Sequence, residues 1–587
     1  MRGMYLKCHK RFKDGKEHRY WSIAESIRTR NGVSTRQVLY LGEINDSQQR
    51  QWCSAIEVVD GGDAGVRQMS LFPEDRVPPA GVVNPVRVRL DAMTLHRPRQ
   101  WGGCWLSLEL WRLLDMESFW GMRLADSRKG TRWTDVLASL VAYRLIDPGS
   151  EWRMHREWFR NTAMADLLGC DESVAAKNTL YRCLAKLCKH RDDLFKHLRG
   201  RWGALFGAKC DILLYDLTST YFECDVPGEF GLRRFGYSRD RRPDCVQVVI
   251  ALVVTPDGLP VAYETMQGCT SDKTTLKDFL AKIETMYGKA GRTWIMDRGI
   301  PTEEVLGEMR DAKTSYLVGT PRGRLTKIQR EVAAQPWRKA RDGIQVKTFA
   351  GEDGDTYVLT RSCGRRDKEQ AMRRRKLKLL IRRLGEITRM KDLSRDALVA
   401  KVAVARHEAG RSAARIMDIS LPTDGAPLSF KLDRAKLRVV RRGEGTYLLR
   451  TNLPPENPED LWRLYITLTE VEQAFKDLKN DLSIRPVFHQ TDAQIEAHIF
   501  AGFLAYCLFV TLKQISKGLA PGLTPRAVLD KFKTVQMLDV HFPTTDGHTL
   551  VLPRYTQPDK DLQILLHRLD MRLPEQPPPR IEAPSGK

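Results

Sequence analysis

Two aspartates follow apolar stretches that have the length of buried β-strands. Asp216 lies in DILLYDLTSTYFE, residues 211–223, and Asp297 lies in GRTWIMDRG, residues 291–299. An aspartate in an apolar environment is costly to bury unless its charge is compensated. Two interpretations remain open from the Asp216 stretch alone: a metal ligand held against a cation, or a strand-end carboxylate that accepts backbone hydrogen bonds.

A third carboxylate lies in a stretch with helical periodicity. Apolar residues at three- and four-residue spacing predict its core-facing side: Val471, Phe475, Leu478 and Leu482. Another face carries residues at steps of three, four and seven: Tyr465, Leu468, Glu472 and Lys479. Glu470 is the nearest alternative to Glu472, but it lies about 200° around the helix and cannot serve the same face.

Packed against the strand ends, Glu472 would complete a pocket of three carboxylates with Asp216 and Asp297. Carboxylate oxygens are ligands of Mg²⁺. Two such ions roughly 3.5–4 Å apart activate a hydroxyl and stabilise a leaving oxygen in phosphoryl transfer. We therefore predict that these three residues are both the catalytic residues and the ligands of two Mg²⁺ ions, for which Mn²⁺ can substitute.

Cationic side chains near these carboxylates are candidates for contacts with DNA. Arg298 directly follows Asp297, and Lys479 and Arg485 follow Glu472. The whole chain has 96 Lys and Arg against 73 Asp and Glu, a net charge of +23 and a pI near 9.5. This charge favours a polyanion as partner. Among such partners we expect nucleic acid first, ahead of the ribosome or a membrane surface.

The elements that must position the two aspartates follow the order β, β, β, α, β, α, β between residues 211 and 320. CVQVVIALVVT, a Pro-Asp-Gly turn and LPVAYETM predict a hairpin beside the first strand. Three antiparallel strands followed by α/β units are the ribonuclease H-like plan. We predict an α/β fold with a ribonuclease H-like catalytic core, a mixed sheet flanked by helices, formed by residues 208–320 and 456–520.

Further domains are expected around this core, because 587 residues exceed what one hydrophobic core usually organises. Residues 1–60 alternate polar and apolar side chains and predict a small antiparallel β module, and the Gly- and Pro-containing segment 61–95 predicts a linker. Residues 96–207 predict a helical domain with a basic exterior that binds DNA. Residues 521–587 form a C-terminal region whose last sixteen residues, RLPEQPPPRIEAPSGK, are predicted to be disordered.

Residues 321–455 are predicted to be a β-rich insertion with a strongly basic helix. Between residues 365 and 391, twelve Lys or Arg stand against three Asp or Glu. An apolar stripe indicates an amphipathic helix: Leu377, Leu380, Ile381 and Leu384. The basic face either lies along DNA phosphates or is merely solvated. The candidates for phosphate contacts are Arg373, Arg374, Arg375 and Lys376.

The cysteine spacing and the N-terminal sequence indicate the cellular compartment in which the protein works. The twelve cysteines include no C-x-x-C, so neither a zinc site nor a disulfide framework is indicated, which fits a reducing cytoplasm. MRGMYLKCHKRFKDGK has no apolar signal core, and the longest apolar run, residues 499–512, is too short to span a bilayer. We expect a soluble, unexported protein without a membrane partner.

Three motifs, in this order, resemble one family. The aspartate of YDLTSTYF, the aspartate of WIMDRG and the glutamate of Y-x6-E-x6-K, continued as VEQAFKDLKNDLSIRPVFH, resemble the DDE transposases of bacterial insertion sequences, in the branch with a Tyr-Arg-Glu-Lys signature. The resemblance covers roughly residues 210–515, and the N-terminal meander is also similar. It implies a catalytic triad and two signature residues: Asp216, Asp297 and Glu472, with Tyr465 and Lys479.

The chain departs from that signature at one position. Leu468 stands where the signature has its arginine. A phosphate contact at that position would then have to come from a neighbour, Arg463 or Arg485.

The resemblance implies cut-and-paste movement of an element bounded by inverted repeats. The end phosphodiester is hydrolysed, and the freed 3′-hydroxyl attacks the other strand and later the target; one triad serves every step, because each is an in-line displacement at phosphorus. The implied partners are double-stranded DNA of the element ends and target, bound by a homodimer in the bacterial cytoplasm at the nucleoid. Two alternatives remain: a metal-dependent structure-specific nuclease with the same fold, and a non-catalytic DNA-binding relic, against which three intact carboxylates speak.

Overall fold

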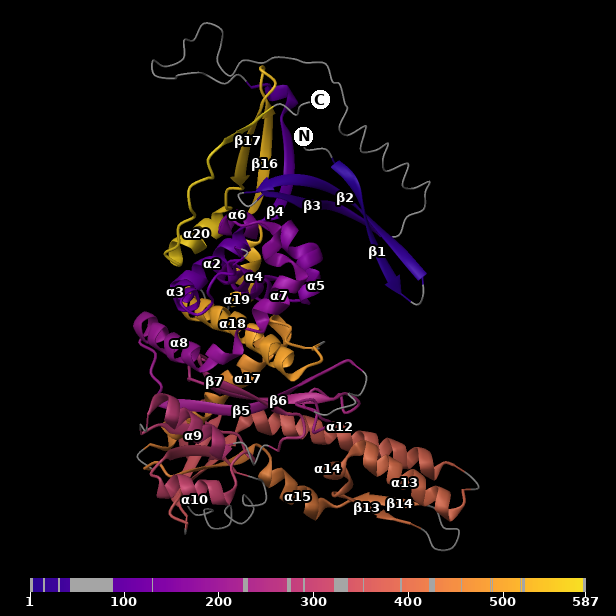
Figure 1. Cartoon of the computed structure of the whole chain (residues 1–587). Helices are drawn as coiled ribbons and strands as arrows, with labels where there is room; N and C mark the ends of the chain where they lie inside the picture. The colour runs from indigo at the N-terminus through magenta and orange to yellow at the C-terminus, as the bar shows by residue number, and fades with distance from the viewer. Residues whose placement is uncertain are drawn as a thin grey trace. The chain divides into compact units, whose positions relative to one another are not determined.

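The computed structural model of the chain divides into two compact units (Figure 1). Met1–Phe206 and Lys476–Lys587 form the first unit, and Gly207–Phe475 form the second. We expected residues 456–520 in the catalytic core, whereas the chain from Lys476 onward groups with the first unit; the predicted domain boundaries stay predictions. The structure describes residues 4–13, 16–29, 32–42, 88–128, 130–224, 231–271, 276–288, 291–320, 336–351, 353–390, 393–421, 428–454, 457–485, 487, 489–517, 519 and 523–583.

A nine-stranded mixed sheet forms the centre of the second unit. Its strand order is β10-β11-β12-β15-β9-β8-β5-β6-β7. β8 is parallel to both β5 and β9, and the other neighbours are antiparallel. The strands are β5 (Ile212–Tyr221), β6 (Gln247–Val254), β7 (Pro260–Gln267), β8 (Thr293–Met296), β9 (Ser315–Gly319), β10 (Arg338–Arg341), β11 (Ile344–Ala350), β12 (Thr356–Ser362) and β15 (Thr446–Thr451).

The predicted succession β, β, β, α, β, α, β between residues 211 and 320 is confirmed. Its helices are α9 (Leu276–Tyr287) and α10 (Glu303–Asp311), which begin and end where the apolar periodicity does. Both pack on one face of the sheet, where the apolar side chains of β5 and β8 join theirs in a single core. That core contains Leu213, Tyr215, Leu217, Trp294, Met296, Phe279, Ile283, Leu306 and Met309.

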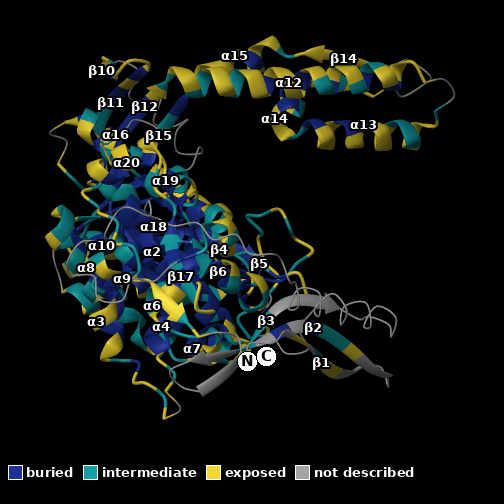
Figure 2. Cartoon of the chain, turned by 90° about the horizontal axis from the view of Figure 1, so that it is seen from above, coloured by how far each residue is buried: buried dark blue, intermediate teal, exposed yellow. Residues whose placement is uncertain are grey.

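The segment predicted as a β-rich insertion extends this sheet, because β10, β11, β12 and β15 all belong to it. Between β12 and β15 the chain forms a helical arm with its own small core, and Figure 2 shows its many exposed residues. Ile381, which we expected in the apolar stripe of the basic helix, is 44% exposed. Ile387 is buried with the three leucines of the stripe instead. The arm consists of α12 (Cys363–Thr388), α13 (Arg395–Ala409), α14 (Arg411–Ala414), β13 (Met417–Ser420), β14 (Ser429–Leu432) and α15 (Arg434–Gly443).

The long helix predicted around Glu472 is broken into three pieces. α16 (Pro458–Ile466) ends one residue before α17 (Leu468–Lys476) begins, and a π-helical turn, η6 (Asp477–Asp481), follows. α16 packs on β9, β10, β11 and β12. The predicted core stripe is confirmed, since its four residues are buried: Val471, Phe475, Leu478 and Leu482.

Helices form the core of the first unit. The predicted helical region is confirmed in α2 (Gly102–Leu113), α3 (Met116–Gly121), α4 (Trp133–Ile146), α7 (Lys177–Leu184) and α8 (Arg191–Phe206). Shorter turns connect them: α5 (Glu151–Arg153), η2 (Met154–Trp158), η3 (Phe159–Asn161), α6 (Met164–Leu168), η4 (Glu172–Ala175) and η5 (Cys188–His190). From the far end of the chain, α18 (Asp492–Ser516) and α19 (Pro525–Phe532) pack among them, α18 against α2 and α4.

α18 is long and apolar enough to cross a membrane by length and composition alone. However, 94% of its most apolar window is buried inside the protein. Figure 2 shows α18 and α2 as mainly buried. A helix that is apolar on every side and covered by other helices is a core helix of the unit.

Two antiparallel sheets complete the first unit. The predicted N-terminal meander is confirmed as β1 (Met4–Lys13), β2 (Lys16–Thr29) and β3 (Gly32–Gly42). A second sheet, in the order β18-β17-β16-β4, joins distant parts of the chain: β4 (Thr94–Gln100), preceded by η1 (Leu90–Ala92), with β16 (Gln536–Pro543), β17 (Thr549–Tyr555) and β18 (Arg580–Glu582). α20 (Lys560–Arg568) lies between β17 and β18 in the chain.

The prediction of a disordered C-terminus is wrong for the described residues up to position 583. β18 pairs with β17, and Arg554 donates to the carbonyl of Pro577 at 2.6 Å. The Gln576 side chain exchanges hydrogen bonds with the backbone of Tyr555 at 3.0 and 2.9 Å. A Pro-rich segment forms little regular structure by itself, but here its backbone acceptors meet partners on a preformed sheet edge.

Candidate active site

Strand pairing places Asp216 beside Asp297. In the parallel register of β5 and β8, Tyr215 is the partner of Met296, so the two aspartates follow paired residues. Asp297 directly follows the end of β8, as predicted. Asp216 lies inside β5, which continues to Tyr221, and the expectation that its strand ends there was wrong.

The face of the sheet that carries Asp216 follows from strand alternation. Leu213, Tyr215 and Leu217 all belong to the core beneath α9 and α10. Successive side chains of a strand point to opposite faces. Asp216 therefore points away from that core, to the face on which Tyr465 of α16 lies against Gly319.

The three predicted catalytic carboxylates influence one another in the second unit. The pKa of Asp216 is raised to about 7: burial is the largest cause, and the charges of Asp297 and Glu472 add to it. The backbone N–H of Leu217 and the charge of Arg239 act in the opposite direction. Asp297 and Glu472 are exposed, and Asp216 is half-buried. This convergence of negative charge is the environment that a divalent cation relieves.

The hydroxyl of Tyr465 donates a hydrogen bond to Oδ1 of Asp297 at 3.2 Å. Burial, followed by the charge of Asp297 and this hydrogen bond, raises the pKa of Tyr465, so the hydroxyl stays protonated as a donor. Gly319 leaves room for it: an added Cβ there would lie 2.6 Å from the Tyr465 oxygen. Tyr465 therefore orients the Asp297 carboxylate, a role that helical periodicity did not indicate.

Replacing Tyr465 by Phe should slow metal-dependent DNA cleavage about tenfold or more, because a hydrogen bond to a charged group is worth about 1.5–3 kcal/mol. Metal binding and DNA affinity should persist, since all three carboxylates remain. Tyr447→Phe is the matched control: the Tyr447 hydroxyl accepts from Trp462 at 2.7 Å. Single-turnover cleavage measures the difference, and equal rates for the two variants would remove Tyr465 from the site.

The position of the signature arginine is a core position in this chain. Leu468 is buried, although we expected it on the face of Tyr465 and Glu472. The break between α16 and α17 separates Tyr465 from Leu468. Leu468 and Glu472 both lie in α17, where Leu468 is on the buried side with Val471. Arg463 is exposed and pairs with Asp460 at 3.4 Å and Glu459 at 3.9 Å.

Three further residues were predicted to contact DNA because they follow Asp297 or Glu472 in the sequence. They are divided between the two units. Arg298 is exposed beside Asp297 in the second unit. Lys479 lies in η6 and Arg485 donates to Asn480 at 3.2 Å, both in the first unit. Their contacts with DNA stay predictions.

Arg373 does not belong to the exposed face of the basic helix. It is 7% exposed, and its guanidinium pairs with both oxygens of Glu444 at 2.6 and 3.2 Å. Such a bidentate pair fixes α12 to the end of α15. By contrast, Arg374, Arg375 and Lys376 are exposed. We therefore revise the phosphate candidates on α12 to these three residues.

Replacing Arg374, Arg375 and Lys376 together by Gln should flatten the salt dependence of DNA binding. Each lost phosphate contact reduces the slope of log K against log salt by about 0.9. Arg383→Gln is the control, because Arg383 pairs with Glu408 at 2.8 Å and Glu386 at 3.3 Å. A triple variant with the wild-type slope would show that α12 is a solvated helix.

Arg239 was not singled out as a site residue. It lies in the loop between β5 and β6, and its backbone N–H donates to Oγ of Ser219 at 3.2 Å. Its positive charge opposes the rise in the pKa of Asp216. The density of arginine in GLRRFGYSRDRRPD was the available signal, but it does not tell which arginine faces the carboxylate.

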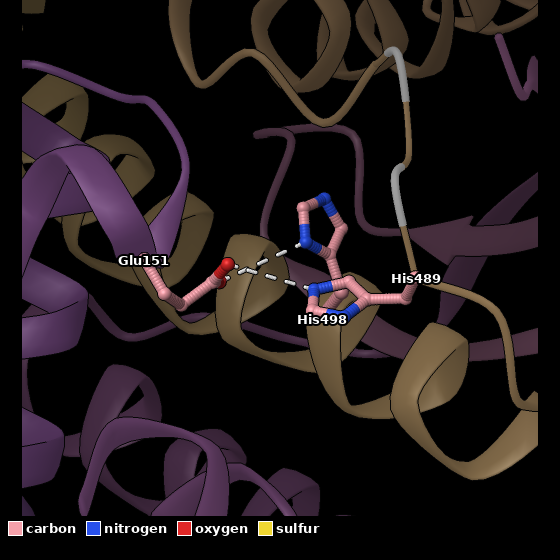
Figure 3. Close-up of side chains that lie close together, drawn as sticks. All are labelled: Glu151, His489 and His498. Atoms are coloured by element: carbon pink, nitrogen blue, oxygen red, sulfur yellow. Dashed lines mark ion pairs between the residues drawn. The ribbon is translucent and has the colours of Figure 1, made fainter. Parts of the chain in front are cut away.

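A second cluster of titratable residues lies buried in the first unit. Glu151, His489 and His498 place three potential ligand atoms within 4.8 Å of one another, a group that could hold a metal ion. Figure 3 shows the Glu151 carboxylate facing both imidazole rings, at 3.6 Å from Nε2 of His489 and 3.9 Å from Nδ1 of His498. We did not predict this cluster, because more than 300 residues separate Glu151 from the two histidines in the chain.

Arg144 supplies a cation to this cluster. It donates to Oε1 of Glu151 at 2.6 Å and lies 3.1 Å from Nδ1 of His498, whose Nε2 lies 3.3 Å from the carbonyl of Ile484. Burial and the charge of Arg144 lower the pKa of His498 to about 3, so this histidine is neutral. Burial disfavours the Glu151 carboxylate, but the charge of Arg144 and the hydrogen bond with His489 outweigh burial and lower the pKa of Glu151. The cluster thus works as a buried ion network.

One family model and one solved structure are similar to parts of this chain. Residues 219–508 match the family model of the transposase DDE domain. The match begins three residues after Asp216 and contains Asp297 and Glu472. No curated protein sequence matches the chain. Among solved structures, the chain is similar to the piggyBac transposase synaptic complex with hairpin DNA, with 9% identity and a TM-score of 0.34 over 75% of this chain and 82% of that one. Residues 219–508 are therefore similar to a transposase DDE domain, a domain of enzymes that cleave and transfer DNA strands.

Proposed function

We propose that this chain is the transposase of a bacterial insertion sequence, which cuts the element out at its terminal inverted repeats and joins it to target DNA. The observation that carries the proposal is the strand pairing that places Asp216 beside Asp297, with Glu472 acting on Asp216 through its charge. The match to a transposase DDE domain supports DNA as the substrate of these carboxylates.

The sheet order supports a ribonuclease H-like core within the larger sheet. β7, β6 and β5 form an antiparallel run, and β8 and β9 continue it in parallel with β5. This arrangement brings a carboxylate inside β5 next to one at the end of β8. The strands β10, β11, β12 and β15 add to the same sheet beyond β9.

The residues at the site have separate tasks in this proposal. Asp216, Asp297 and Glu472 would hold divalent cations, Mg²⁺ or Mn²⁺, which when bound activate the attacking oxygen and stabilise the leaving oxygen. Tyr465 holds the carboxylate of Asp297 in place. Arg298, Lys479 and Arg485 position DNA through its phosphates. We further propose a homodimer in the DNA complex, located at the bacterial nucleoid.

A strand-joining assay tests the proposed function. The substrate is duplex DNA that carries the short inverted repeats flanking the gene, incubated with the full chain, Mg²⁺ and a target plasmid. We expect cleavage at the repeat end, followed by covalent joining of the freed 3′-end to the plasmid. Cleavage without any joined product would instead identify a structure-specific nuclease, and binding without either reaction would identify a non-catalytic relic.

A further inference from the structure

The loop between β5 and β6, which also contains Arg239, exposes two aromatic side chains. Tyr237 is 84% exposed and Phe235 is 44% exposed, with only Gly236 between them. Aromatic rings are usually buried because of their large apolar area. Five arginines stand in the same loop: Arg233, Arg234, Arg239, Arg241 and Arg242. Exposed rings among cations are the composition of a surface that binds nucleic acid.

The backbone that carries these rings is fixed to the sheet. Arg234 and Gln247 exchange two backbone hydrogen bonds, at 3.1 and 2.9 Å, and the backbone N–H of Gly268 donates to Leu232 at 3.0 Å. The side-chain amide of Gln247 donates to the carbonyls of Tyr237 and Gly268 at 3.1 and 2.9 Å. The rings therefore project from an anchored loop.

Gly236 is required for this anchoring. An added Cβ would lie 2.1 Å from the carbonyl oxygen of Gly268. Real side chains do not approach a backbone oxygen that closely, so the loop can follow the sheet edge only with glycine between the two rings. The close approach keeps Phe235 and Tyr237 at a constant place relative to β6 and β7.

The same loop is joined to β5 and contains Arg239, whose charge acts on Asp216. Two residues after Tyr237, the backbone N–H of Arg239 donates to Ser219, which lies three residues beyond Asp216 on β5. Arg239 also acts electrostatically on Asp216. A strand of DNA whose phosphate reaches Asp216 would therefore meet the loop that carries the exposed rings.

The arginines of the loop have different tasks. Arg242 pairs with Glu223 and Asp244, both at 2.9 Å, and lies over the ring of Tyr221, so it holds the loop together. Arg241 is exposed and carries its charge on the surface. Positive charge next to aromatic rings suits a ligand that has both phosphates and flat bases.

We propose that Tyr237, supported by Phe235, stacks against an unpaired base of the DNA strand that enters the carboxylate site. In a duplex both faces of each base are covered by its neighbours, so an exposed ring can stack only where pairing and stacking are interrupted. This inference rests on the proposed function for the identity of the strand. It adds a residue that positions DNA by shape and stacking, apart from those that contact phosphates.

Binding of a single-stranded oligonucleotide that contains 2-aminopurine tests this inference, with the full chain and without divalent metal. Tyr237→Leu should weaken binding about 5- to 100-fold and reduce quenching of the fluorescent base, while Tyr237→Phe should bind as wild type does. Affinity for fully paired duplex should change less than twofold. Trp152→Leu, which removes a 48% exposed ring in the first unit, is the control.

The outcomes separate this inference from the proposed function. Wild-type single-strand affinity and quenching in Tyr237→Leu would overturn the stacking role, even if the chain cleaves and joins DNA. Equal weakening for single strand and duplex would also overturn it, because the residue would then be a general DNA contact. If stacking is lost in Tyr237→Leu but wild type neither cleaves nor joins repeat ends, the inference stands and the proposed function fails.

Discussion

Replacing Asp216, Asp297 or Glu472 by Ala should lower Mg²⁺-dependent cleavage of element-end DNA by several orders of magnitude, because in the proposed function each substitution removes a ligand of the catalytic metals. Gel-shift affinity in Ca²⁺ or without metal should remain near wild type, since phosphate contacts position the DNA. Asp216 and Asp297 occupy adjacent strands in register, and Glu472 acts on Asp216 through its charge. Loss of any one should therefore disable the same centre.

Glu470→Ala is the matched control for Glu472→Ala. Both glutamates lie in α17, but Glu470 is half-buried and Glu472 is exposed. Near-normal cleavage by Glu472→Ala, with loss in Glu470→Ala, would show that the helix register is wrong. Loss of DNA binding in parallel with cleavage would show instead that the substitution disturbed the fold.

The pH dependence of this centre has a definite sign. A carboxyl group must lose its proton to bind a metal. Because the pKa of Asp216 is raised to about 7, the group is protonated below that pH and ionised above it. Metal affinity and cleavage should therefore increase with pH up to about 7, at close to tenfold per unit below it for a single proton. Metal titrations at pH 6 and pH 8 measure the difference.

Replacing Glu151 by Gln should destabilise the first unit by about 3–5 kcal/mol, because it leaves the Arg144 guanidinium buried without its carboxylate. Arg144 and Glu151 are 2% and 3% exposed, and neither can turn to solvent. Urea unfolding followed by tryptophan fluorescence measures the loss, since α2, α3 and α4 carry buried tryptophans. A second variant, Arg144→Met with Glu151→Leu, should recover much of it by removing both charges.

Acid should destabilise wild type through the same cluster. The pKa of His498 is lowered to about 3 in the folded chain and is about 6.5 when unfolded. The folded state binds fewer protons between these values, so stability is complete above pH 6.5 and falls as pH decreases toward 3. His498→Asn should flatten this dependence.

An exposed ion pair provides the control for Glu151→Gln. Lys531→Ala breaks the pair of Lys531 with Asp561 and should cost at most about 1 kcal/mol of stability. An equally small cost for Glu151→Gln would contradict the prediction.

The strands and the carboxylates that they carry could be predicted because their signals are local. Apolar runs of strand length precede Asp216 and Asp297, and the register of two parallel strands then places the side chains together. Glu472 could be chosen over Glu470 because helical periodicity separates a core face from an exposed face. These signals need only a few consecutive residues.

The wrong or missing predictions share a physical cause. Tertiary contacts decide which of these residues are buried and which partners they have. The break at Thr467 separates Leu468 from the helix of Tyr465, and Leu468 is buried with Val471 in α17. Arg373 is buried because Glu444, far along the chain, offers a carboxylate. Likewise, nothing near Glu151 in the sequence indicates that Arg144 and two distant histidines surround it. Long-range partners of this kind have no periodic signature.

The discontinuity of the first unit has a consequence for the order in which the chain folds during synthesis. Helices α2 and α4 bury their apolar sides against α18, which the ribosome makes about 300 residues after α8. At roughly 5–20 residues per second, these helices wait on the order of 15–60 s for their partner. Gly207–Phe475, by contrast, is contiguous and can fold as soon as it emerges. We therefore expect the nascent chain to expose apolar helices early, to depend on chaperones during that interval, and to complete its first unit last.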